Sequence, residues 1–421
     1  MTRNREVPIG LLVKSISLAR AISTLTLVLA AVAPVYAQTS EGGPDPAKVR
    51  VRIGPLWMNP TVSLTNLGVD DNVFNEPEDH SPKRDVTFTV TPTTDLWVRM
   101  GRTWLSGSIK EELVWYQKYA TERAANSGYK LGWKVPLNRL VVDVGATYLN
   151  ARDRPGYEID ARALRTEAAY KGVVEVRALS KTFFGVRAER QQIDFDKTAV
   201  FLGALLQSEL NHVTTGAGVT ARHQLTPLTS VSFAASRSQD RFEFSPLRDS
   251  DSDTAAVTLA FDPFALIKGG ATFGYRDFHP RSAGVDDYKG LTAAIDLSYT
   301  LLGVTKVAVR ALRDVQYSFD VNQPYYLQTG IEGSIAQQIF GPFDVVGRLG
   351  VQSLAYRDRA GATVLVVDRV DSVRTYGAGV GYHLGKDLRL GFNVDQSRRD
   401  SDVASRRYSG FKFGTAVTYG L

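Results

Sequence analysis

After residue 37 the sequence alternates between apolar and polar residues, and turn signals interrupt the alternation every 10 to 16 residues. The segment 291–301 is typical: its odd positions are Leu, Ala, Ile, Leu, Tyr and Leu, and its even positions are Thr, Ala, Asp, Ser and Thr. Because successive side chains of a strand point to opposite faces, each such segment predicts a strand with one apolar and one polar face. The polar face is rich in charge, which favours a barrel with lipid outside and water inside over a soluble sandwich.

The N-terminal 37 residues are predicted to be a cleavable signal peptide. Its basic part holds Arg3, Arg5, Lys14 and Arg20, an apolar run AISTLTLVLAAVAPV follows, and Val35-Tyr36-Ala37 forms a small-residue cleavage site before Gln38. A membrane anchor is the alternative, but the apolar run falls short of the roughly 20 residues that a spanning helix needs. We therefore expect a signal peptide at 1–37, a short periplasmic segment at 38–57 and a barrel at 58–421.

The composition excludes some classes of function and of binding site. The chain carries a net charge of +6, and removal of residues 1–37 leaves +3 spread along the sequence. A nucleic-acid-binding protein would show a concentrated basic surface instead, so we expect no nucleic-acid partner. The chain has no cysteine, which excludes disulfides and thiolate metal sites.

The turn signals divide the barrel segment into eighteen predicted strands, an even number. Their ranges are 58–68, 85–100, 103–118, 127–135, 139–151, 164–178, 182–195, 207–222, 229–241, 253–262, 267–278, 289–301, 304–318, 326–339, 343–357, 370–384, 387–398 and 406–421. Short turns alternate with longer polar loops such as 70–85, 245–253 and 278–290. Short periplasmic turns and long external loops are typical of an antiparallel up-and-down transmembrane barrel. Eighteen strands are expected to enclose an aqueous lumen.

Arginine recurs about every 41 residues, where alternate strands enter the long loops. The positions are Arg152, Arg190, Arg237, Arg276, Arg313, Arg357 and Arg398. A period near 41 is also compatible with a propeller of four-stranded blades. Each repeat here holds only two long strands, so we interpret the period as one hairpin plus its loop.

Charged residues of the polar parity are the candidate lumen lining. They are Lys110, Arg187, Arg222, Arg276, Arg310, Arg348, Arg389, Lys412, Glu112, Asp296, Asp314, Glu332 and Asp395. Unpaired charges are costly in hydrocarbon, so these side chains must face water or one another. In one interpretation they neutralise each other and stiffen the wall, and in the other the cations select anionic solutes. Aromatic residues on the apolar parity gather near strand ends, as in interfacial girdles.

The sequence contains no convincing motif of a catalytic, metal or cofactor site. Gly377-Ala-Gly379-Val-Gly381 lies inside a predicted strand and opens no helix, unlike a phosphate-binding loop. The acidic run 249–253 lacks the glycine and glutamate of a calcium loop, and the five histidines are scattered. We therefore predict no enzyme, no catalytic residue, no cofactor and no metal.

Short motifs resemble a known family. Gly68-Val-Asp70-Asp71-Asn72-Val-Phe74, Arg84-Asp85 and the repeated Tyr/Arg/Asp strand ends are similar to the beta-barrel porin family found with exopolysaccharide biosynthesis and export systems. The C-terminus resembles the barrel assembly signal at Lys412, Gly414, Val417 and Tyr419, although it ends in Gly420-Leu421 instead of an aromatic residue. The resemblance implies an outer-membrane channel that passes a secreted polysaccharide.

The leading hypothesis is therefore a channel in the outer membrane of a Gram-negative-type cell, as the exit pore of an exopolysaccharide export system. A general diffusion porin for small solutes and a closed structural or adhesion barrel remain open alternatives. The expected partners are outer-membrane lipid, the barrel-assembly machinery, a polysaccharide and periplasmic export components.

Overall fold

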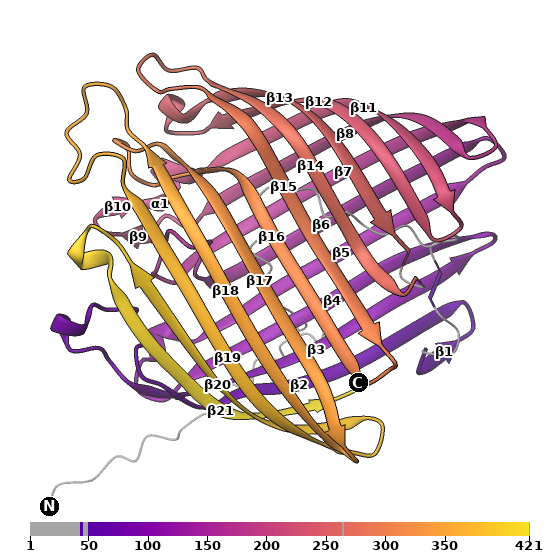
Figure 1. Cartoon of the computed structure of the whole chain (residues 1–421), viewed down its shortest axis with the longest axis horizontal. Helices are drawn as coiled ribbons and strands as arrows, with labels where there is room; N and C mark the ends of the chain where they lie inside the picture. Colours follow the sequence, from indigo (N-terminus) through magenta and orange to yellow (C-terminus); the bar gives the residue numbers. More distant parts are fainter. Residues whose placement is uncertain (1–42, 45–48, 263–264, 421) are drawn as a thin grey trace, which may run out of the picture.

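The computed structural model describes residues 43–44, 49–262 and 265–420. The predicted signal peptide lies outside the described residues. Eighteen antiparallel strands close into one tilted barrel (Figure 1). None of the helices in the described ranges is long and apolar enough to cross a membrane.

The barrel strands follow one another around the wall in chain order. The first nine are β2 (Leu56–Asp70), β3 (Asp85–Met100), β4 (Thr103–Tyr116), β5 (Ala124–Pro136), β6 (Leu140–Asp153), β7 (Ala163–Leu179), β8 (Thr182–Phe195), β11 (His212–Thr226) and β12 (Thr229–Phe242). The other nine are β13 (Ser250–Phe261), β14 (Ile267–Pro280), β15 (Tyr288–Leu301), β16 (Thr305–Tyr317), β17 (Tyr325–Phe340), β18 (Phe343–Arg357), β19 (Val370–Leu384), β20 (Leu388–Asp400) and β21 (Tyr408–Tyr419).

The first and last barrel strands close the cylinder. β2 pairs with β21 from Val62↔Tyr419 to Asp70↔Lys412, with a register shift between Leu64 and Leu67. The short strand β1 (Val51–Ile53) pairs with the start of β2, before the point at which the pairing of β2 with β21 begins. β2 is thus paired on the same side by two different segments of the chain.

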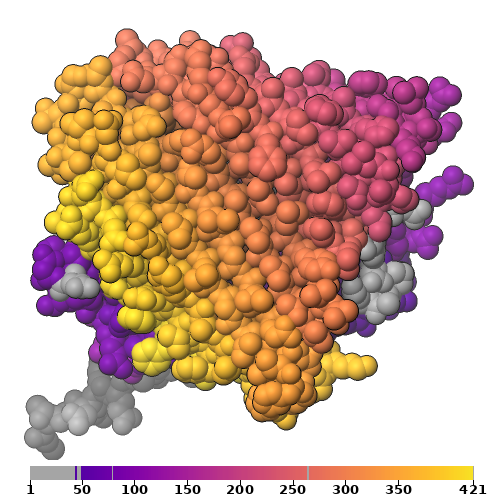
Figure 2. Space-filling view, viewed as in Figure 1, coloured from indigo at the N-terminus to yellow at the C-terminus, as the bar shows by residue number. Residues whose placement is uncertain are grey.

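Side-chain exposure confirms which face is outside. Large apolar side chains such as Tyr170, Phe233 and Phe273 are exposed on one parity of their strands. Figure 2 shows the closed outer surface that the C-terminal strands, coloured orange and yellow, present on the side facing the viewer. In membrane barrels an apolar outer surface of this kind contacts lipid, and the opposite parity faces the lumen.

The predicted strands agree with the observed strands except near residue 207. The sequence predicts a strand over 207–222, but Leu206–Leu210 is the helix α1 and β11 begins at His212. The reason is packing, since Leu206 and Leu210 lie one helical turn apart and are both buried. β5 and β13 also begin three residues earlier than predicted, at Ala124 and Ser250.

Eight short turns lie at one end of the barrel and nine longer loops at the other. The long loops hold short 3-10 turns, η1 (Glu78–His80), η2 (Ala120–Glu122), η3 (Pro246–Arg248) and η4 (Ala404–Arg406). Two of these loops are central to the site: the crossing loop (154–162) and the helical loop (196–211). The helical loop contains β9 (Val200–Phe201), β10 (Ala204–Leu205) and α1.

Candidate functional site

We expect the charged side chains of the polar parity to line the lumen. Every predicted lumen residue lies on the parity opposite to the exposed apolar residues of its own strand or of a paired strand. Within the lumen, Arg187, Arg222, Arg276 and Asp314 line a cavity of about 450 Å³. The cavity lies next to the two inward-folded loops, because Glu158, Ile159 and Leu210 also line it.

Most of the predicted cations pair with a carboxylate across the wall. The ion pairs are Arg222–Glu175 at 2.5 Å, Arg276–Asp314 at 2.9 Å, Arg310–Asp296 at 3.2 Å, Arg348–Asp395 at 2.7 Å, Arg389–Asp344 at 2.6 Å and Lys412–Asp70 at 2.9 Å. Paired charges of this kind cancel much of the field that a row of free cations would create. This arrangement supports the mutually neutralised wall of the two interpretations.

Two of these ion pairs pass over a glycine of the middle strand. Arg348 on β18 and Asp395 on β20 both face Gly377 of β19, and a Cβ at Gly377 would lie 2.3 Å from the Asp395 carboxylate and 2.7 Å from Arg348 Nε. Gly381 leaves the same space for Arg389, whose Nη2 would lie 2.3 Å from a Cβ there. The glycine-rich run of β19 therefore allows side chains of β18 and β20 to meet.

The remaining predicted residues make weaker or different contacts. Arg187 lies 3.7 Å from Glu189, and Glu112 accepts a hydrogen bond of 3.2 Å from the Asn126 amide. Lys110 Nζ is buried and has no hydrogen-bond partner among the described residues. Glu332 accepts a hydrogen bond from the Tyr157 hydroxyl, which brings it into contact with the crossing loop.

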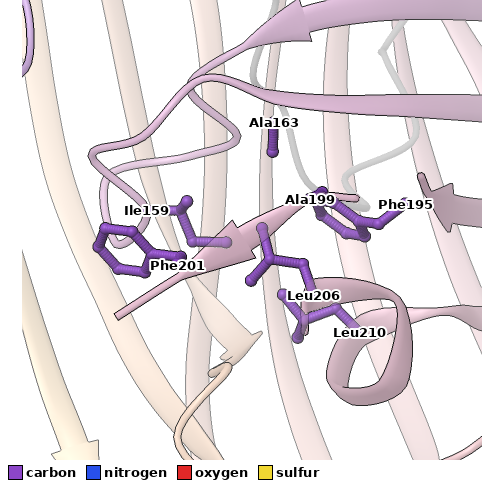
Figure 3. Close-up of a cluster of buried hydrophobic side chains, with 7 residues drawn as sticks. All are labelled: Ile159, Ala163, Phe195, Ala199, Phe201, Leu206 and Leu210. Atoms are coloured by element: carbon purple, nitrogen blue, oxygen red, sulfur yellow. The ribbon is translucent and has the colours of Figure 1, made fainter. Parts of the chain in front are cut away.

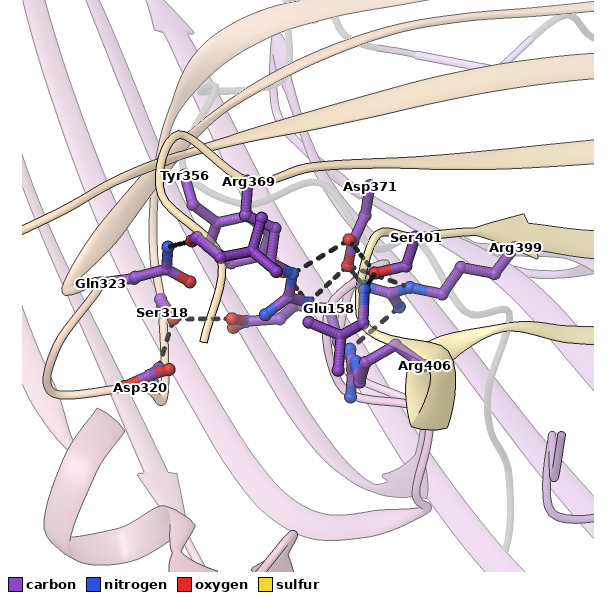
Figure 4. A network of polar contacts seen from close by, with 12 residues as sticks. Glu158, Ser318, Asp320, Gln323, Tyr356, Arg369, Asp371, Arg399, Ser401 and Arg406 are labelled. Atoms are coloured by element: carbon purple, nitrogen blue, oxygen red, sulfur yellow. Dashed lines mark hydrogen bonds and ion pairs between the residues drawn. The ribbon is translucent and has the colours of Figure 1, made fainter. Parts of the chain in front are cut away.

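The crossing loop spans the lumen from β6–β7 to the opposite wall. Its Tyr157 reaches Glu332 on β17, and its Glu158 accepts a hydrogen bond of 2.6 Å from the Ser318 hydroxyl and one of 3.2 Å from the Phe319 N–H. Glu158 is buried and comes from a different wall than Ser318 (Figure 4). Because β7 and β17 lie nearly opposite in strand order, these contacts bridge the interior of the barrel.

The crossing loop is held by Arg399, Asp371, Arg369 and Arg406, which we call the anchor. Arg399 on β20 is its central residue. Its fully buried guanidinium donates 2.7 Å to the Tyr157 carbonyl and pairs with Asp160 at 3.1 Å. On its other side it pairs with buried Asp371 of β19 at 2.5 Å, which Arg369 also contacts (Figure 4). One arginine thus joins two carboxylates, one on the wall and one on the loop.

Arg406 completes the anchor from η4. Its guanidinium donates to the Glu158 carbonyl and lies 3.4 Å from the Asp160 carboxylate. It also stacks over the ring of Phe201 at 4.9 Å, so it touches both inward loops. The crossing loop is therefore held by charge and by hydrogen bonds to its backbone.

The helical loop packs against the crossing loop through an apolar cluster. The cluster consists of Ile159, Ala163, Phe195, Ala199, Phe201, Leu206 and Leu210 (Figure 3). Arg248 of η3 connects the helical loop to the loop that follows β16. It pairs with Glu209 at 2.7 Å and donates a hydrogen bond of 2.8 Å to the Ser318 carbonyl. Together the two loops make buried contacts with each other and with the opposite wall at the long-loop end.

The inward contacts of the two loops were not predicted from the sequence. Tyr157, Glu158, Asp160 and Arg399 were outside the candidate set, because the set followed strand parity and three of these residues lie in a loop. One signal was available: Arg399 breaks the pattern by placing a second arginine directly after the periodic Arg398. Within the described ranges, no group of three or more His, Asp or Glu side chains could hold a metal ion.

The predicted assembly signal lies on the closing strand. Tyr419 is exposed on the outer face, and Val417 shares its parity and pairs with exposed Leu390. Lys412 and Gly414 have the inward parity, and Lys412 pairs with Asp70 of β2. The four residues therefore divide between the lipid side and the lumen side of the seam.

The barrel fold agrees with the family that the sequence matches. The family described as "Putative beta-barrel porin 2" matches residues 45–420. The chain belongs to this porin family. This porin is accordingly a protein of the outer membrane. No curated protein sequence matches it.

Solved structures show weak similarity to this porin. A BenF-like porin from Pseudomonas fluorescens Pf-5 is 12% identical, with 88% of this chain and 99% of that chain covered and a TM-score of 0.47. The outer membrane protein OpdK from Pseudomonas aeruginosa is 12% identical, with 86% and 98% covered and a TM-score of 0.44. A bacterial polysaccharide outer membrane secretin is 8% identical, with 88% and 100% covered and a TM-score of 0.32.

The pairing of the wall charges predicts weak ion selectivity. We expect open wild-type channels to show a modest anion preference that fades with salt, because the lumen is wet and screened. The triple variant Arg310→Glu/Arg348→Glu/Arg389→Glu should become clearly cation-selective, since it also leaves three aspartates without a cation. Reversal potentials in planar bilayers under a salt gradient measure this change.

The matched control is Arg152→Glu/Arg237→Glu/Arg313→Glu, which makes the same charge change on the outward parity. It should leave the reversal potential unchanged. If the luminal triple variant also keeps the wild-type reversal potential, the three luminal arginines brace the wall and do not influence ions in transit.

Proposed function

We propose that this porin is a gated channel whose crossing loop closes the lumen. The proposal rests on the contacts of Glu158, Asp160 and Arg399, which connect a loop of one wall to strands and loops of the opposite wall. A closed eighteen-stranded barrel would otherwise enclose a wide aqueous lumen. Passage of a large solute then requires the loop to leave its anchor.

We further propose that the cargo is a secreted exopolysaccharide. The motifs at 68–74 and 84–85 support this cargo through their resemblance to porins of exopolysaccharide systems. The neutralised wall also supports it, because a long polar polymer passes most easily where no isolated charge holds it. A loop that closes the idle channel would protect the cell from leakage between export events. Periplasmic export components would then dock at the short-turn end.

Small solutes are the second candidate cargo. The observation that favours them is the cavity of about 450 Å³ beside the inward loops, a volume typical of small-molecule sites. A solute that fits this cavity could pass with a smaller displacement of the loops. The closed structural or adhesion barrel would instead keep the loops in place permanently.

Deletion of the gene in its native host tests the cargo. If the porin exports a polysaccharide, the deletion strain should retain polymer inside the envelope, and the wild-type gene should restore secretion. Unchanged secretion together with slower uptake of labelled mono- and disaccharides would identify the small-solute channel. Unchanged secretion and unchanged uptake would favour the structural barrel.

The burial of Glu158 predicts that the closed state depends on pH. Burial raises the pKa of the Glu158 carboxyl above its usual 4.5, and the Ser318 hydroxyl and Arg406 oppose this rise only in part. The closed loop therefore binds the proton more tightly than a released loop with Glu158 in water. This stabilisation is complete below the usual pKa and is lost as the pH rises through the raised pKa.

We accordingly expect channel opening to increase as the pH is raised from 4.5 through the raised pKa of Glu158, which bilayer recordings at a series of pH values measure. Glu158→Gln resembles the protonated form, so it should keep the channel closed and remove this pH dependence. Asp296→Asn, a carboxylate of the wall outside the crossing loop, is the control and should retain it. A Glu158→Gln channel with the wild-type pH profile would show that another group titrates.

A further inference from the structure

Three arginines gather on the outer surface near the long-loop end of β19–β21. Arg374 on β19 lies directly opposite Arg398 on β20. Arg407 is exposed and directly precedes Tyr408, the first residue of β21. The pair Arg399↔Tyr408 ends the β20–β21 ladder, so Arg407 lies just beyond that ladder. We call Arg374, Arg398, Arg407 and Asp400 the outer arginine cluster.

The cluster faces away from the lumen. Arg374 shares its parity with Tyr376 and Val380, which are exposed apolar residues of the outer face. Arg398 likewise shares its parity with exposed Val394, whereas its neighbour Arg399 points inward and is buried. The periodic arginine Arg398 is thus separate from the anchor of the crossing loop.

One carboxylate serves the directly opposed arginines. Asp400 lies 3.1 Å from Arg374 Nη1 and 3.0 Å from Arg398 Nε, and all three side chains are well exposed. Arg407 uses its Nε to donate to the Ser401 carbonyl at 2.5 Å. Like charges directly opposite on neighbouring strands destabilise a sheet, and one aspartate offsets only one of three cations. The four side chains therefore carry a net charge of +2 and retain N–H groups that are free to bind an anion.

The surface below the cluster is apolar and aromatic. Tyr376 and Phe411 both pair with Gln396, two residues from Arg398, and both are exposed. Val394 and Phe413 continue this surface toward the middle of the barrel wall. This order, with aromatic residues at the interface and cations just beyond them, matches the level of lipid headgroups beside a membrane barrel.

We propose that the outer arginine cluster binds the phosphate of a phosphorylated glycolipid in the outer leaflet of the outer membrane. Guanidinium groups bind phosphate through paired N–H donors, and two of them at one point provide a bidentate site. The acyl chains of the same lipid would lie on Tyr376, Phe411 and Val394. The long-loop end is the external end of outer-membrane barrels, so the cluster meets the outer leaflet and not the inner one.

Lipid binding to the full-length porin in detergent tests the proposal. The probe is bisphosphorylated lipid A, and native mass spectrometry counts the bound molecules. We expect Arg374→Gln/Arg398→Gln to bind at least tenfold more weakly than the wild type. The matched control Arg237→Gln/Arg313→Gln removes two outward arginines elsewhere and should bind as the wild type does. Equal binding by both double variants would overturn the proposal.

Two further probes separate the lipid from its phosphate. Dephosphorylated lipid A should bind to the wild type as weakly as bisphosphorylated lipid A binds to Arg374→Gln/Arg398→Gln, and equally tight binding would show that the arginines are not the recognition element. Inorganic phosphate should not displace bound lipid A at equal concentration, because it lacks the apolar contacts, and full displacement would overturn the assignment to a lipid. If the strand variants fail to assemble, Arg407→Gln, which lies outside the strands, should still reduce lipid binding, and unchanged binding would count against the proposal.

Discussion

Replacing Arg399 by Gln is expected to open the channel. The substitution removes the cation that joins half-buried Asp160 of the crossing loop to buried Asp371 of the wall. Among the described residues, Asp371 then keeps only Arg369 as a cation, and Asp160 keeps only Arg406. Removing one partner of a buried ion pair typically costs about 3–5 kcal/mol, and the loop can relieve this cost by moving into water. A change of about 3 kcal/mol corresponds to roughly a hundredfold shift in the closed-to-open equilibrium.

Single-channel recordings in planar bilayers measure this shift as the fraction of time spent open. The matched control is Arg348→Gln, an arginine of the wall whose pair with Asp395 does not touch the crossing loop. It should leave the closed state intact. If Arg399→Gln opens no more often than Arg348→Gln, the crossing loop is a fixed part of the wall and the gating proposal fails.

A charge on the outer face of the last strand is expected to impair assembly. Tyr419→Asp and Val417→Asp place a carboxylate toward lipid on the strand that must close onto β2. Charged substitutions on the lipid face cost up to a few kcal/mol, and a cost of about 1.4 kcal/mol already lowers the equilibrium constant for assembly roughly tenfold. Where assembly is near balance, we therefore expect roughly fivefold less folded barrel in the outer membrane for each variant.

The adjacent Thr418→Asp provides the control for this prediction. Thr418 has the inward parity and pairs with Arg389, so a new carboxylate there faces water and a nearby cation. Outer-membrane fractions run unboiled and boiled on a gel measure the folded barrel, because a closed barrel satisfies its backbone hydrogen bonds and resists detergent. Equal amounts of folded barrel in all three variants would contradict the face assignment of β21.

The wall of this porin was largely predictable because its signal is local. The alternation of 291–301 and its repeats identify strands and faces without knowledge of distant contacts, and the eighteen predicted strands correspond to the eighteen observed. The partners of the wall charges were less accessible. Arg348 meets Asp395 two strands away only because Gly377 lies between them, and that depends on the register of three strands.

The anchor of the crossing loop could not be predicted by the same reasoning. Glu158 and Arg399 are 241 residues apart in the chain and meet only after the barrel has closed. No periodicity describes a loop that folds inward, and the predicted strand over 207–222 wrongly included most of α1, whose Leu206 and Leu210 are buried in the loop cluster. Loop contacts of this kind depend on the diameter of the finished barrel.

The barrel is closed by a shorter strand pairing than those in the rest of its wall. β2 is held by β3 along nearly its whole length, but on its other side it is shared between β21 above and the three residues of β1 below. The shift between Leu64 and Leu67 interrupts the ladder with β21. The line between the first and last strands is therefore the weakest seam of the wall, and β1 caps a strand edge that would otherwise be open to pairing with another chain.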